Sequence, residues 1–123
     1  MPCVTIQRAV FLWLLLATGS ACAADAERGR ELYEARCIGC HSIEANRVGP
    51  MHRGVFGRKA GSVADFAYSP ALRSSSVIWG EETLDRWLAN PQRLIPGQRM
   101  NFSVSRAEDR ADLIAYLKGA AAP

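Results

Sequence analysis

The stretch Cys37-Ile38-Gly39-Cys40-His41 decides how the rest of the chain is interpreted. Two cysteines separated by two residues and followed at once by histidine form the pattern for covalent attachment of a c-type haem. Each thiol can form a thioether with one of the two vinyl groups of a single porphyrin, and the histidine is then delivered to the iron as an axial ligand. The motif therefore predicts one covalent haem, attached through Cys37 and Cys40 and ligated by His41.

The motif alone leaves three other interpretations open. A redox disulfide between Cys37 and Cys40 in a thioredoxin-like site would need βαβ surroundings, and the sequence has no strand-helix-strand pattern. A structural zinc site needs four N or S ligands, and beyond residue 24 the chain offers only these two cysteines, His41 and His52. The third interpretation is chance occurrence of the motif.

Residues 1–24 have the features of a cleaved secretory signal peptide. Arg8 closes a short, weakly positive segment, residues 9–17 are apolar, and small residues lead up to Ala23 and Ala24. The apolar run is well short of the roughly 20 residues that a membrane span needs. We expect cleavage after Ala23 or Ala24 and a periplasmic domain of residues 25–123 without stable membrane insertion. A retained anchor and a lipoprotein modified at Cys22 are the alternatives.

The expected mature chain is close to electrical neutrality. Of the 15 Lys and Arg residues one, Arg8, lies in the signal segment, which leaves 14 against 12 Asp and Glu. A nucleic-acid partner would need a clustered basic face, so this balance argues against one. A domain of about 100 residues buries only a small core, to which a covalent haem would add a large apolar filler. We expect a monomer.

The hydrophobic pattern predicts an all-α domain with three main helices. The first covers residues 25–36 with Asp25 as N-cap, and the second covers residues 80–89. The third runs to about Lys118 and opens with a capping box from Ser105 to Glu108. Residues 42–60, 62–76 and 91–102 are irregular. So much loop is unusual in a compact domain, and wrapping around a cofactor would explain it.

A haem iron bound by His41 needs a second axial ligand or keeps an open position. The candidates beyond residue 24 are Met51, His52 and Met100. Met51 and His52 follow His41 closely, whereas Met100 comes much later, in a loop that contains Pro96 and Gly97. We expect Met100 to bind the iron, and His52 to lie near the haem edge or in solvent. Histidine with methionine raises the reduction potential.

At this point the sequence resembles a known family, the class I c-type cytochromes, over nearly all of residues 25–123. Beyond Cys37-x-x-Cys40-His41, the resemblance rests on motifs spread along the chain. They are Gly29-x-x-x-Tyr33, Val48-Gly49-Pro50, Gly54-Val55-Phe56-Gly57-Arg58-Lys59-Ala60-Gly61, Phe66-x-Tyr68-Ser69-x-Ala71, Trp79, Trp87-Leu88-x-Asn90-Pro91, Ile95-Pro96-Gly97-x-x-Met100-x-Phe102 and Asp112-Leu113-Ile114-Ala115-Tyr116-Leu117.

The resemblance implies a fold and a set of roles. The fold would be three main helices plus loops wrapped around one covalent haem, and its first and last helices would cross. His41 and Met100 would be the axial ligands, and the Pro50 carbonyl would accept a hydrogen bond from His41. A further set of residues would hold a buried haem propionate: Arg58, Tyr68 and Trp79.

The implied function is electron transfer without a chemical substrate, so we expect no enzyme activity. The partners would be redox proteins, namely an oxidase, reductase or dehydrogenase, met transiently. Three positions depart from the family pattern near the haem: Trp87, Gln98 and Leu72. Two other functions stay open. A gas-binding or peroxidase-like protein would need Met100 off the iron, and a dedicated subunit of an oxidoreductase complex would stay bound to one partner.

Overall fold

The computed structural model describes residues 22–120 and 122, so the predicted signal segment lies outside the described residues except for Cys22–Ala24. Within these described residues, five helices follow one another: α1 Ala26–Arg36, α2 Pro70–Arg73, α3 Glu81–Ala89, α4 Pro91–Leu94 and α5 Ala107–Ala120. The described part contains no strand, only an isolated antiparallel bridge between Lys59 and Ile78. The predicted all-α fold is confirmed. None of the described helices is long and apolar enough to span a bilayer.

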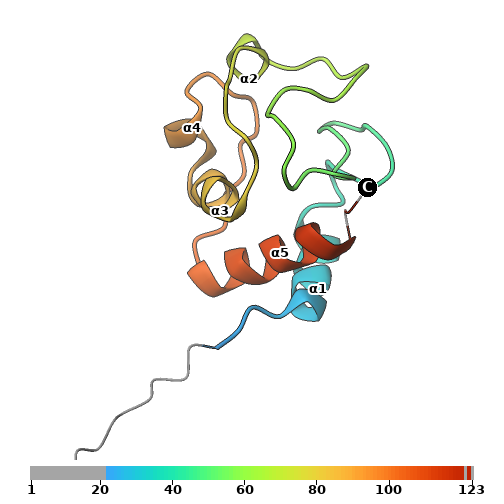
Figure 1. Ribbon diagram of the computed structural model, residues 1–123, viewed down its shortest axis with the longest axis vertical. Coiled ribbons are helices and arrows are strands. Elements are labelled where there is room, and N and C mark those ends of the chain that lie inside the picture. Colours follow the sequence, from blue (N-terminus) through green and yellow to red (C-terminus); the bar gives the residue numbers. More distant parts are fainter. Residues whose placement is uncertain (1–21, 121, 123) are drawn as a thin grey trace, which may run out of the picture.

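Helices α1 and α5 cross at the lower end of the molecule, and the loops and shorter helices form the rest (Figure 1). Asp25 begins α1 as predicted, since its side chain accepts hydrogen bonds from the backbone N–H groups of Glu27 and Arg28. The buried residues of α1 are Gly29 and Tyr33. The Tyr33 ring packs on the ring of Tyr116 in α5, with centroids 5.2 Å apart.

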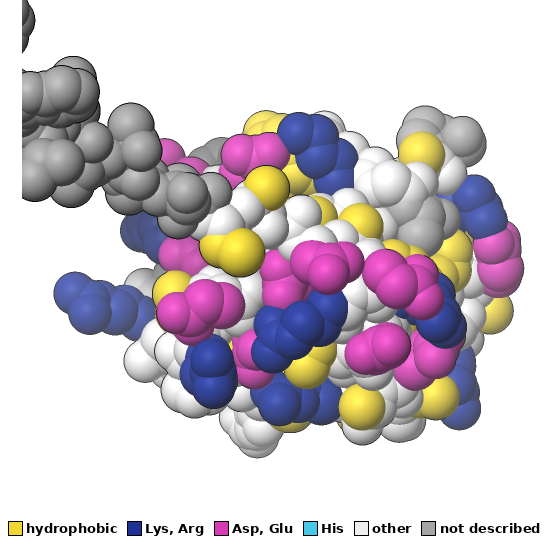
Figure 2. Space-filling view, turned by 90° about the horizontal axis from the view of Figure 1, so that it is seen from below, with side chains coloured by type: hydrophobic (Ala, Val, Ile, Leu, Met, Phe, Trp, Pro, Cys, Tyr) yellow, Lys and Arg dark blue, Asp and Glu magenta, His cyan; other side chains and the backbone are white. Residues whose placement is uncertain are grey.

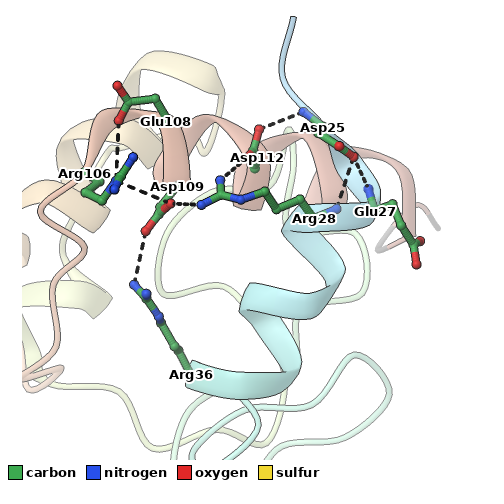
Figure 3. A network of polar contacts seen from close by, with 8 residues as sticks. All are labelled: Asp25, Glu27, Arg28, Arg36, Arg106, Glu108, Asp109 and Asp112. Carbon is green, nitrogen blue, oxygen red and sulfur yellow. Dashed lines mark hydrogen bonds and ion pairs between the residues drawn. The ribbon is translucent and has the colours of Figure 1, made fainter. Parts of the chain in front are cut away.

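An ion-pair network ties the same two helices together along one edge (Figure 3). The Arg28 guanidinium contacts both Asp109, at 2.5 Å, and Asp112. The Asp109 side chain is only 3% exposed, and Arg36 lies 3.4 Å from its other oxygen. Burying a carboxylate without a partner costs free energy. The crossing of α1 and α5 offsets this cost, because it brings the arginines of α1 into ion pairs with the carboxylates of α5.

The start of α5 differs from the prediction. The helix begins at Ala107, and the Arg106 carbonyl accepts its first backbone bond, from Arg110 N–H. The predicted capping box would have begun the helix one residue earlier, after Ser105. The Arg110 guanidinium instead binds the carbonyls of Val104 and Ser105 at 3.0 and 2.8 Å, which keeps the Ser105 carbonyl outside the helix.

Two short helices lie in segments that the sequence analysis treated as loop. α2 starts at Pro70, and Ser69 Oγ accepts a hydrogen bond from Leu72 N–H at 3.2 Å. α4 starts at Pro91, where Asn90 Oδ1 plays the same part for Arg93 N–H at 3.0 Å. A capping side chain followed by proline at the first helical position is a helix start signal. Each helix is only one turn long, so no hydrophobic periodicity could have revealed it.

The buried apolar residues form one cluster shared by the helices and the long loops. Leu113 and Val104 are 1% exposed. The cluster consists of Tyr33, Val55, Ala60, Val63, Tyr68, Leu72, Trp79, Leu84, Leu88, Ile95, Val104, Leu113, Ile114 and Leu117. Six of these residues come from the segment 42–79, where only a single short helix forms. The loops are therefore part of the core, and they position the residues described next.

Candidate haem centre

The motif Cys37–His41 forms a tight turn at the carboxyl end of α1. Cys37 caps the helix, and its N–H donates to the Tyr33 carbonyl at 2.8 Å. The Cys37 carbonyl then accepts from the N–H groups of both Cys40, at 3.1 Å, and His41, at 2.9 Å. Helix and turn thus hold both thiols and the imidazole on one short piece of backbone, as attachment of a single porphyrin requires.

The thiols of Cys37 and Cys40 are free. Burial raises the pKa of the Cys37 thiol to about 11. A redox-active cysteine in a Cys-x-x-Cys motif has a lowered pKa instead, so the thioredoxin-like interpretation is not supported. Within the part of the chain that the structure describes, no three side chains of His, Cys, Asp or Glu gather as a metal site would need, so the zinc interpretation has no ligand set.

His41 is held by the segment that follows it. Its Nδ1 lies 2.8 Å from the Pro50 carbonyl oxygen. Because a carbonyl only accepts, Nδ1 carries the proton, and Nε2 keeps a lone pair that a metal can use. Burial lowers the pKa of His41, which favours the neutral imidazole. A Cβ at Gly49 would lie 2.6 Å from both ring nitrogens, so only glycine fits against this ring.

His52 lies against the ring of His41. The two rings stack with centroids 4.1 Å apart and planes 20° apart, and His52 Nδ1 is 2.9 Å from the hydroxyl of Tyr33. Burial lowers the pKa of His52 to about 3. Of the two positions expected for His52, near the haem edge or in solvent, the structure excludes the solvent position. The side chain is partly buried and contacts the ring of His41 directly.

Arg58, Tyr68 and Trp79 come together although they are far apart in the sequence. Backbone pairing joins the first and last of them, with Trp79 N–H donating to the Arg58 carbonyl at 2.9 Å. Tyr68 and Trp79 belong to the same core cluster. Burial raises the pKa of Tyr68, while the hydrogen bond from Val63 N–H and the charge of Arg58 lower it by smaller amounts. Tyr68 and Trp79 are 9% and 7% exposed.

Not every N–H group of the Arg58 guanidinium has a hydrogen-bond partner among the described residues. One terminal nitrogen donates to the Arg53 carbonyl at 2.7 Å, and the other donates to the Met51 carbonyl at 2.9 Å. Its Nε–H is buried and has no hydrogen-bond partner among the described residues. An unpaired buried donor is expensive, and a carboxylate would pair with both its hydrogen and its charge.

Met100 lies in the loop between α4 and α5. Gly97, with φ of +90°, turns this loop. The buried side chain of Gln98 supports it, because its Oε1 accepts from the N–H of Met100. Met100 is partly exposed and lines a cavity of about 230 Å³ with neighbouring residues such as Asn90 and Phe102. It is therefore not part of the packed core.

A profile of the family described as Cytochrome c matches residues 26–121. The chain belongs to the cytochrome c family. Among its relatives are cytochrome c 2.1 of Caenorhabditis briggsae, 44% identical over 99 residues, which cover 78% of this chain and 88% of the relative. Cytochrome c of Chlamydomonas reinhardtii is 44% identical over 104 residues, or 81% of this chain and 93% of that protein.

The fold matches a solved member of the cytochrome c family. The structure of cytochrome cH from Methylobacterium extorquens superposes with a TM-score of 0.74 at 43% identity, over 77% of this chain and 98% of the other. Sequence and fold therefore assign this chain the same kind of cofactor. The protein carries one haem c, bound covalently through Cys37 and Cys40, and it is a monohaem electron carrier.

The residues present fit a cytochrome c haem. The thiols are free, His41 offers Nε2, and the unpaired Nε–H of Arg58 suits a propionate carboxylate. Two features of the site were missed in the sequence. The stack of His52 on His41 gives no sequence signal, because it depends on how two loop residues meet. The bond from Gln98 to the backbone of Met100 had a weak signal, namely a polar residue directly after Gly97 in the methionine loop.

Proposed function

We propose that the protein is a periplasmic, monomeric electron carrier whose haem iron is ligated by His41 and Met100. When bound, the haem supplies one-electron chemistry by cycling between ferric and ferrous iron. The observation that carries this proposal is the tautomer of His41. The bond to the Pro50 carbonyl fixes the proton on Nδ1 and directs the lone pair of Nε2 away from that carbonyl.

Met100 is the candidate that best suits the second axial position. A ring stacked on His41 lies on the same side of the metal as His41, so His52 is a poor candidate for the opposite ligand. Met51 lies between Pro50 and His52, and its carbonyl is used by Arg58. Met100 comes from a separate loop and is not packed in the core. With both positions filled, the iron passes electrons but binds no substrate.

Arg58, Tyr68 and Trp79 are proposed to hold a haem propionate. The free Nε–H and the charge of Arg58 offset the cost of burying a carboxylate. The Tyr68 hydroxyl accepts from Val63 N–H at 3.2 Å and keeps its own hydrogen to donate. Burial raises the pKa of Tyr68, so this donor stays protonated.

Redox partners, such as an oxidase, reductase or dehydrogenase, are proposed to dock transiently on a face other than that of α1 and α5. Seen from below, that end of the molecule carries acidic and basic side chains interspersed, as Figure 2 shows. Arg53 is paired with Glu44. Four exposed cations are proposed to contribute to docking: Lys59, Arg73, Arg93 and Arg99.

Periplasmic location is supported by the position of the family match, which begins at residue 26, directly after the predicted signal segment. Fractionation of producing cells, with mass analysis of the protein, tests this part of the proposal. A mature chain that starts at Ala24 or Asp25 in the periplasmic fraction is expected. An uncleaved chain, or one confined to the cytoplasm, contradicts it.

The ligand proposal is tested by the visible absorption spectrum of the purified holoprotein, ferric and ferrous, with and without carbon monoxide. A low-spin spectrum that carbon monoxide does not change is the expected result, because no position on the iron is open. A high-spin or carbon-monoxide-sensitive spectrum overturns His41 and Met100 as the ligand pair and favours gas binding or catalysis.

A further inference from the structure

The position of His52 beside His41 is fixed by the backbone. His52 N–H donates to the Ser42 carbonyl, and Arg53 N–H donates to the Ile43 carbonyl, both at 2.9 Å. Residues 52 and 53 are thereby bonded to the two residues that follow His41. The stack of the imidazole rings, with centroids 4.1 Å apart, is thus a consequence of how this loop closes on itself.

Tyr33 holds the His52 ring from the side of α1. Its hydroxyl lies 2.9 Å from His52 Nδ1, and the two rings meet edge to face with centroids 5.6 Å apart. Tyr33 is 2% exposed and packs on Tyr116 at the crossing of α1 and α5. The ring of His52 is therefore held both by its own loop and by a buried residue at the crossing of α1 and α5.

The contacts of His41 bear on one motion of its side chain, the rotation of the imidazole ring about its bond to the metal. An imidazole bound to a metal through Nε2 can turn about that bond, which changes the direction of the ring plane. The hydrogen bond to Pro50 restrains the ring at Nδ1, and the backbone at Gly49 lies against it. The stacked ring of His52 adds a flat surface, and a turn of His41 away from the observed plane would break this contact.

We propose that His52, held by Tyr33, is a positioning residue that fixes the plane of the His41 ring relative to the haem. This inference rests on the proposed role of His41 as an axial ligand. This role explains why position 52, which is partly buried, holds a polar ring. An aliphatic side chain could fill the same space but would not present a flat face to His41. The role also predicts that the hydroxyl of Tyr33 acts through His52.

The test uses the holoprotein with His52 changed to Leu and to Phe, and with Tyr33→Phe. Proton NMR of the ferric form gives the hyperfine-shifted haem methyl resonances, whose spread and order depend on the direction of the axial ligand planes. We expect His52→Leu to keep covalent haem and a low-spin spectrum but to change the order or spread of these resonances. His52→Phe, which keeps a flat ring, should stay close to the wild-type pattern.

Tyr33→Phe keeps the packing of α1 and removes only the hydroxyl, so it provides a second measurement if His52→Leu does not fold. We expect a change in the same direction as for His52→Leu, and no additional change when the two substitutions are combined. Wild-type resonances in both His52→Leu and Tyr33→Phe would overturn the inference, even if stability fell. A high-spin wild-type protein would instead overturn the ligand proposal on which it rests.

Discussion

Gly29 in α1 lies directly against the backbone carbonyl of Asp112 in α5. A Cβ at position 29 would overlap that oxygen and would lie 3.0 Å from the Cβ of Tyr116. The two helix backbones therefore touch at this point, and the absence of a side chain is what lets them do so. The same two α5 residues also make contacts with neighbours of Gly29, since Asp112 pairs with Arg28 and Tyr116 packs on Tyr33.

Gly29→Ala should destabilise the protein. Alanine favours a helix by about 1 kcal/mol over glycine, but the methyl group would push α5 away. Overpacking of this kind costs about 1–3 kcal/mol, and the obstacle is a backbone carbonyl that cannot change rotamer. We expect a lower urea midpoint for unfolding of the holoprotein. Gly119→Ala is the matched control, because a Cβ there meets no described atom within 4 Å, and its midpoint should not fall.

The crossing of the first and last helices was implied by the family resemblance, whereas the first helix itself could be predicted because its signals are local. Gly29 and Tyr33 are four residues apart on one helical face, and Asp25 has the side chain of an N-cap. The same reasoning identified the haem motif, whose chemistry lies within five consecutive residues. These features need no knowledge of which distant segments meet.

The contacts between loops could not be predicted in the same way. Whether His52 faces solvent or stacks on His41 depends on the bonds from residues 52 and 53 to residues 42 and 43. Likewise, the unpaired Nε–H of Arg58 results from two loop carbonyls that occupy its other nitrogens. No periodic pattern encodes such contacts, because they arise from tertiary packing of irregular backbone.

Asp109→Asn should reduce the sensitivity of the protein to acid. The hydrogen bond from Arg28 is the main reason that the pKa of Asp109 lies below its ordinary value of about 3.9. The stability gained from this lowered pKa is complete above about pH 3.9 and is lost as the pH falls through the folded-state pKa. Urea midpoints should show Asp109→Asn less stable than the wild type at pH 7, with the difference shrinking below pH 4.

Glu108→Gln is the control for this comparison. Glu108 neighbours Asp109 in α5, but its side chain is 72% exposed and lies 3.8 Å from Arg106. An exposed pair of this kind contributes little, so Glu108→Gln should follow the wild type at every pH. An unchanged gap between Asp109→Asn and the wild type from pH 7 to pH 2 would contradict the assigned role of the Arg28 contact.

Met100→Ala should keep the haem covalently bound but open the position opposite His41. Loss of the thioether ligand leaves an iron that water or carbon monoxide can bind, so the ferric spectrum should change to a high-spin or water-ligated form. Met51→Ala is the matched control, since it removes the same side chain from the segment next to Pro50 and should leave the spectrum unchanged. A wild-type spectrum in Met100→Ala would remove Met100 from the ligand set.

Cys37→Ser combined with Cys40→Ser should abolish covalent attachment of the haem. Hydroxyls do not replace thiols in the thioether bonds, and the free thiols of both residues lie on the turn after α1. The haem should then pass entirely into the organic phase on extraction with acidified solvent. Cys22→Ser is the control. Cys22 lies before the domain matched by the family, so this variant should retain the haem. Haem that still resists extraction from the double variant would disprove attachment at these cysteines.

Arg58→Leu should lower the midpoint potential of the haem. The guanidinium is a partly buried cation whose pKa is lowered by burial, and its free Nε–H is the feature that suits a propionate. Removing a positive charge beside the haem favours the more positive ferric state. We expect a fall on the order of 59 mV, the one-electron equivalent of a tenfold change in equilibrium constant. Arg58→Lys keeps the charge but not the fork of donors, so its potential should fall less in the same redox titration. A potential equal to that of the wild type in Arg58→Leu, with the haem retained, would mean that Arg58 does not lie beside the propionate.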